Sequence, residues 1–69
     1  MNKVHYNVTG LLNSTVKTQV KHVLNEIDGV NKVNVDLVNS SIDVGYNNDS
    51  TDEKEIKQGI EHVGCKIES

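Results

Sequence analysis

The apolar side chains of this chain recur with two different periods, and the order in which these periods alternate is the strongest limit on its fold. Every second residue from Val4 to Val8 is apolar or aromatic, which indicates a strand with one buried face. Val16, Val20 and Val23 are three or four positions apart, which indicates one face of a helix. The same reasoning predicts, in order, strand 3–9, helix 15–27, strand 31–38, strand 41–47, helix 52–63 and strand 65–69.

Polar residues and a glycine mark the expected ends of the two helices. Asn13 or Ser14 can cap the first helix, because a short polar side chain accepts a hydrogen bond from a free N–H of the first turn. Asp52 and Glu55 have the spacing of a capping box at the start of the second helix. Gly29 lies one or two residues beyond the expected end of the first helix.

This order of elements contains two β-α-β passages, and each requires a right-handed crossover that places both helices on one face of the sheet. The sequence therefore predicts an α+β fold, a ferredoxin-like β-α-β-β-α-β sandwich with a four-stranded antiparallel sheet and two helices on one face. A chain of 69 residues is expected to form a single domain, residues 1–69. The strand residues expected beneath the helices are Val4, Tyr6, Val8, Val33, Val35, Leu37, Ile42, Val44 and Tyr46.

The composition excludes several classes of function. Seven lysines and no arginine against ten acidic residues leave a net charge of -3, which argues against binding nucleic acid. Cys65 is the only cysteine, so no internal disulfide can form, and a reducing compartment such as the cytoplasm is expected. No apolar run approaches the roughly 20 residues that span a bilayer.

Two activities known for this kind of topology are also disfavoured. RNA-binding modules stack bases on aromatic residues of the open sheet face. Tyr6 and Tyr46 instead alternate in step with the valines that are expected to be buried, so both are expected to point under the helices. A phosphate-binding hydrolase of this fold would need an arginine. Ser14 and Ser50 have no histidine at a spacing that suits a nucleophile and its base, so the chain is not expected to be an enzyme.

The loop before the first helix carries a family resemblance. Val8 and Gly10 lead into it, and Leu11 follows. Further along, the chain reads Asp-Gly-Val at 28–30 and ends its second helix with Gly64. Over nearly its whole length the chain resembles the heavy-metal-associated domains, and especially the small free-standing bacterial copper chaperones. Those proteins carry the motif Gly-Met-x-Cys-x-x-Cys at this position.

The resemblance implies that both metal-binding cysteines are absent here. They would fall at Asn13 and Val16, and Leu11 stands in place of the family's methionine. Cu(I) prefers soft thiolate ligands, which neither an amide nor an isopropyl group replaces. Leu11 is expected to keep the loop anchored in the core.

The resemblance also places the single thiol beside this loop. The family's tyrosine after the closing glycine falls at Cys65, with His62 three residues earlier. A thiolate and an imidazole can hold Cu(I) or Zn(II) weakly, so Cys65 and His62 are the candidate metal ligands. The plainer alternatives are a core position for Cys65 and a helix C-terminal role for His62.

Two functions follow from the resemblance. The first is a copper-chaperone-like metal-trafficking protein that binds Cu(I) weakly through Cys65, with the second ligand supplied by glutathione or by the partner's Cys65 in a homodimer. The second is a metal-independent interaction module that docks a domain of a metal-transporting P-type ATPase, or a regulator. The chain is expected to be a monomer or a weak homodimer.

Overall fold

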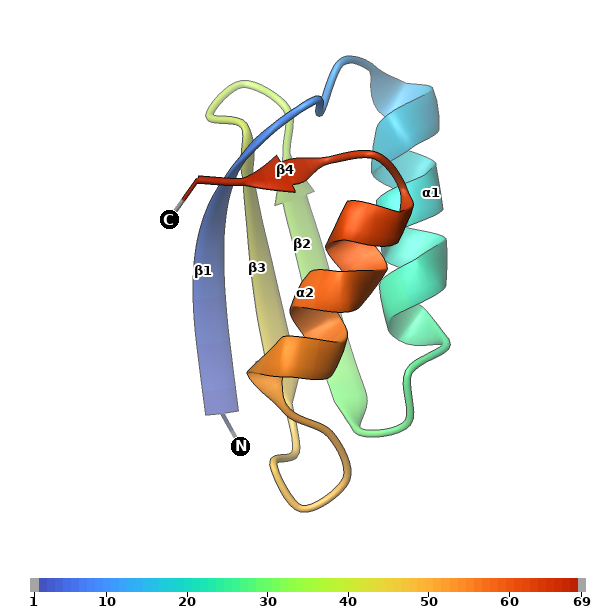
Figure 1. Cartoon of the computed structure of the whole chain (residues 1–69), viewed down its shortest axis with the longest axis vertical. Coiled ribbons are helices and arrows are strands. Elements are labelled where there is room, and N and C mark those ends of the chain that lie inside the picture. The colour runs from blue at the N-terminus through green and yellow to red at the C-terminus, as the bar shows by residue number, and fades with distance from the viewer. Residues whose placement is uncertain (1, 69) are drawn as a thin grey trace.

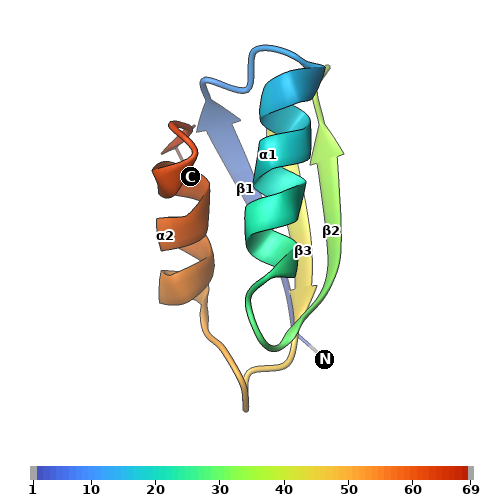
Figure 2. The same ribbon diagram turned by 90° about the vertical axis from the view of Figure 1, so that its right-hand side faces the viewer.

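The computed structural model describes residues 2–68, and their fold is the one predicted (Figure 1). The four strands form one antiparallel sheet in the order β2-β3-β1-β4. Both helices cover the same face of this sheet (Figure 2). The expected domain limits, residues 1 and 69, lie outside the described residues. The elements are β1 (Asn2–Thr9), α1 (Ser14–Asn25), β2 (Val30–Asp36), β3 (Ser41–Tyr46), α2 (Glu53–His62) and β4 (Lys66–Ile67).

The strand register places the predicted apolar residues on the face beneath the helices. Val4 pairs with Val44, and Ile42 lies between Tyr6 on β1 and Val35 on β2. Burying these side chains is the main favourable contribution to the stability of so small a fold. The helices add four side chains that are completely shielded from solvent: Val20, Leu24, Ile56 and Ile60.

A β-bulge near the start of β2 is the main departure from simple alternation. The register shifts between Val30, which pairs with Tyr46, and Lys32, which pairs with Gly45. The extra residue is Asn31. Val30 and Val33 are three positions apart and would face opposite sides of a regular strand, yet both pack against the core. The bulge resolves this conflict, because one extra residue between Val30 and Val33 lets both side chains point to the same face of the sheet.

The helix starts agree with the predicted caps, and the helix ends differ from the prediction in two respects. The Asn13 side chain accepts a hydrogen bond from the Val16 N–H at 3.0 Å, and Asp52 accepts one from the Glu55 N–H at 3.0 Å. The Glu55 carboxylate accepts a hydrogen bond from the Thr51 hydroxyl at 2.9 Å instead of completing the capping box. Helix α1 ends at Asn25, earlier than expected, and a turn containing Gly29 leads into β2.

The two helices approach each other closely at Gly59. A Cβ built on this residue would lie 3.1 Å from Leu24 Cδ2, so any larger side chain would press on the α1 core residue.

No helix among residues 2–68 is long and apolar enough to cross a membrane.

Candidate functional site

The loop between β1 and α1, residues 10–13, lies against the connection between α2 and β4. A Cβ built on Gly10 would lie 3.1 Å from the Gly64 carbonyl oxygen and 3.4 Å from Cys65 Cα. Gly10 has φ of +87°, a left-handed conformation that favours glycine. The predicted proximity of Cys65 to this loop is therefore confirmed, although 55 positions separate the two residues.

The loop turns one leucine inward and the next one outward. Leu11 is 7% exposed and belongs to the core, which confirms its predicted role as the anchor of the loop. Leu12 is 82% exposed. Adjacent side chains in a loop outside a helix point in different directions, so the pair Leu-Leu was the one sequence signal for an exposed leucine.

Asn13 and Val16, the positions at which the resemblance places the family's cysteines, have structural roles in this chain. Asn13 adopts an extended backbone and caps α1 through its side-chain oxygen. Val16, in the first turn of α1, is half-buried and packs against the core. Neither side chain offers a soft ligand, so the loop itself is not equipped to hold Cu(I).

Cys65 lies beneath the loop and not on its surface. Its side chain is 3% exposed and packs within the core cluster. Burial raises the pKa of the Cys65 thiol, because the charged thiolate is poorly solvated there. The thiolate is the form that binds a metal, so this position weakens Cys65 as a ligand unless the loop opens.

His62 is the last residue of α2, and its side chain is exposed. Among residues 2–68 no hydrogen bond or ion pair joins it to Cys65, and no group of three or more His, Cys, Asp or Glu side chains is placed to hold a metal ion. His62 and Cys65 are close in the sequence, but the His62 side chain faces solvent and the Cys65 side chain faces the core.

The same end of the molecule exposes a second large apolar side chain. Val38, in the turn between β2 and β3, is 94% exposed. This turn and loop 10–13 both lie at the upper end of the sheet in Figure 1. The Val8 N–H donates to the Ser40 carbonyl at 2.9 Å, which fixes the turn against the end of β1. We call Leu12 and Val38 the apolar pair. The sequence analysis did not single out either residue.

Comparison with known proteins identifies the family. The heavy-metal-associated domain matches residues 6–66, and the chain belongs to this family. No curated protein gives a significant match. The structure is similar to that of a CopZ metallochaperone, with 30% identity, a TM-score of 0.94 and coverage of 97% of this chain and all of the other.

Two further solved structures are similar over almost their full length. One is a copper-binding domain from HMA7, a P-type ATPase, with 30% identity, a TM-score of 0.90 and coverage of 100% and 96% of the two chains. The other is the yeast copper transporter domain Ccc2a, solved in apo and Cu(I)-loaded states, with 29% identity, a TM-score of 0.87 and coverage of 97% and 94%. The expected absence of enzyme activity agrees with this family of non-catalytic metal-trafficking domains.

Proposed function

We propose that this chain is a docking module of the metal-trafficking family, which binds a heavy-metal-associated domain of a metal-transporting P-type ATPase without delivering tightly bound metal. The observation that carries this proposal is the apolar pair beside a loop that has no soft ligand. Leu12 and Val38 are the exposed large apolar side chains of the described chain, and both lie at the loop end. Large apolar side chains exposed at one end of a small domain are candidate contacts for a protein partner.

The site also keeps the scaffold that such docking needs. Leu11 anchors the loop, Asn13 caps the helix behind it, and Gly10 packs on the α2–β4 connection. A preorganised surface loses less conformational entropy when a partner binds. Similarity to a copper-binding ATPase domain and to a metallochaperone supports a partner of the same fold.

Docking can be tested by NMR titration of the ¹⁵N-labelled protein with the heavy-metal-associated domain of a copper ATPase from the same organism. We expect amide shifts to cluster at residues 10–17 and 38–41, and Leu12→Ser and Val38→Ser to weaken binding. Gln58→Ser, an exposed change on α2, is the control and should leave binding unchanged. The proposal fails if the shifts lie elsewhere or if neither apolar variant affects them. Binding to a regulator but not to the ATPase domain would also reject this choice of partner.

The second candidate function is weak Cu(I) binding through Cys65, and the contact between Gly10 and the Cys65 backbone favours it. A movement of loop 10–13 would uncover the only thiol of the chain, at the loop where the family resemblance places the metal-binding motif. Binding would release the thiol proton, and glutathione or the partner's Cys65 would complete the coordination of the metal. His62 is the other candidate ligand on this chain.

An anaerobic Cu(I) titration against a competing chelator distinguishes the two candidates. If Cys65 binds copper, the parent protein should take up the metal at a fixed ratio in the presence of glutathione, and Cys65→Ser should not. One copper per two chains would indicate a bridged homodimer. A smaller loss in His62→Ala would identify His62 as the second ligand. Equal copper uptake by the parent and Cys65→Ser would reject this candidate and leave docking unaffected.

A further inference from the structure

The sheet face that the helices leave open carries a hollow of about 350 Å³, formed by residues of β1, β2 and β3. Its position depends on the strand register. Gly45 on β3 pairs with Lys3 on one side and with Lys32 on the other. The two lysines therefore flank a residue that has no side chain, and their Cα atoms are separated by two interstrand spacings, about 10 Å. This spacing allows two flexible ammonium groups to approach one ligand.

The β-bulge in β2 contributes directly to this arrangement. The extra residue, Asn31, lets Val30 pack against the core while Lys32 pairs with Gly45 on the open face. Bulges redirect side chains in this way and are frequent beside binding sites. The bulge thus allows Val30 to pack in the core and Lys32 to line the hollow.

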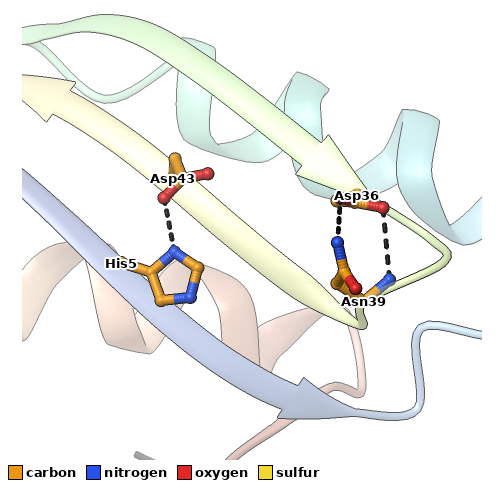
Figure 3. Close-up of polar contacts among 4 residues, drawn as sticks. All are labelled: His5, Asp36, Asn39 and Asp43. Atoms are coloured by element: carbon orange, nitrogen blue, oxygen red, sulfur yellow. Dashed lines mark hydrogen bonds and ion pairs between the residues drawn. The ribbon is translucent and has the colours of Figure 1, made fainter.

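The charges around the hollow favour an anionic ligand. Among residues 2–68, neither Lys3 nor Lys32 forms an ion pair. The one carboxylate in the wall, Asp43, is already occupied, because its Oδ1 lies 2.6 Å from His5 Nδ1 (Figure 3). Two lysine cations without an ion-pair partner therefore lie beside a carboxylate that is already hydrogen-bonded to His5, on a chain whose net charge is -3.

The next row of residues on the open face carries polar side chains that can contact the rest of a ligand. Asn34 pairs with Asp43 across the strands, so His5, Asp43 and Asn34 form one row next to the row of Lys3, Gly45 and Lys32. The volume lies within the range of small-molecule sites and is several times larger than an isolated anion needs. We propose that this hollow binds a small organic anion, with its phosphate or carboxylate group between Lys3 and Lys32 and its polar remainder against His5 and Asn34.

NMR titration of the ¹⁵N-labelled protein with glycerol phosphate, succinate and inorganic phosphate tests this proposal and identifies the anionic group. We expect one of the two organic probes to cause saturable shifts at residues 3–5, 32–34 and 43–45. Lys3→Gln/Lys32→Gln should weaken that binding roughly tenfold, as expected for the loss of two charge-assisted contacts in an open site. Gly45→Val keeps both charges but places a side chain between the lysines, and it should weaken binding by a similar factor.

The matched control is Lys21→Gln/Lys54→Gln, which removes the same charge from exposed positions on the helices. This variant should bind like the parent. Saturable binding that only the sheet variants reduce supports the site. Shifts that do not saturate, an equal loss in the control, or inorganic phosphate binding as tightly as both organic probes would overturn it. Because the readout is independent of copper and of the ATPase domain, failure here would not affect the proposed function.

Discussion

Gly10 packs directly on Cys65, and this contact joins the β1–α1 loop to the start of the last strand. The Cα of Cys65 would lie 3.4 Å from a Cβ at Gly10, and the Gly64 carbonyl oxygen would lie 3.1 Å away. Gly10 also has a positive φ of +87°. Gly10→Ala therefore combines a backbone penalty of about 1 kcal/mol with a close approach to main-chain atoms. Urea unfolding should show a loss of about 2 kcal/mol, within the usual range for a single substitution.

Gly64→Ala is the matched control for that prediction. Gly64 has a positive φ of +107°, but a Cβ there would have no neighbour within 4 Å. This variant should lose only the backbone penalty, about 1 kcal/mol. Equal losses in the two variants would show that the contact with Cys65 contributes nothing.

The thiol of Cys65 should react slowly with a disulfide reagent. The side chain is buried and its pKa is raised, so both access and thiolate population are reduced. We expect the reaction at pH 8 to be much slower than that of the unfolded protein in urea, and to accelerate as the pH rises. Gly10→Ala should increase the rate by loosening the loop. A rate in the native protein equal to that in urea would show that Cys65 is freely accessible.

Placing cysteines at positions 13 and 16, where the resemblance puts the family's ligands, should create a copper site and remove the helix cap. In Asn13→Cys/Val16→Cys the two thiols would lie at positions where α1 begins, and soft thiolates are the ligands that Cu(I) prefers. The double variant should bind one Cu(I) far more tightly than the parent in a chelator competition. The apo form should lose about 1 kcal/mol, because the Asn13 cap is absent.

Asn13→Ala separates the two effects. It should show the same loss of stability in urea with no gain in copper binding. If the double cysteine variant does not bind copper more tightly than Asn13→Ala, then the loop no longer has the geometry of a metal loop.

His5 should titrate above its usual pKa, because the Asp43 carboxylate 2.6 Å away accepts its hydrogen bond and favours its charged form. A raised pKa in the folded state stabilises the protein fully below the unfolded pKa of about 6.5, and this contribution disappears as the pH rises through the folded value. NMR titration of the His5 ring should show the raised pKa. Asp43→Asn should return the pKa of His5 to its ordinary range, whereas an unchanged value in this variant would exclude Asp43 as the cause.

The fold was predictable because its signals are local and agree with one another. Period-two and helical patterns, capping residues and a short turn each describe a few neighbouring residues, and the right-handed crossover then leaves one arrangement of the sheet. Where local patterns conflict, the prediction was less complete. Val30 and Val33 both pack inward only because of the bulge at Asn31, and the single-strand pattern around them gave no reason to insert an extra residue.

The candidate site was predictable in part, for a related reason. The family resemblance placed Cys65 beside loop 10–13, and the contact with Gly10 confirms that placement. The exposure of each side chain depended on packing that no local pattern contains. The structure buries Cys65, exposes His62, and gathers Leu12 and Val38 at one end.

The sequence by itself determined the order of elements, the buried face of each strand, the Asp52 cap of the second helix and the absence of thiols at positions 13 and 16. Those properties follow from residue type and spacing along the chain. Only the tertiary structure decided which lone side chains face solvent, that Cys65 lies buried beneath Gly10 rather than on the loop surface, and that two lysines 29 positions apart flank Gly45. These relationships join residues that are distant in the chain, so they arise only when strand register and helix packing are complete.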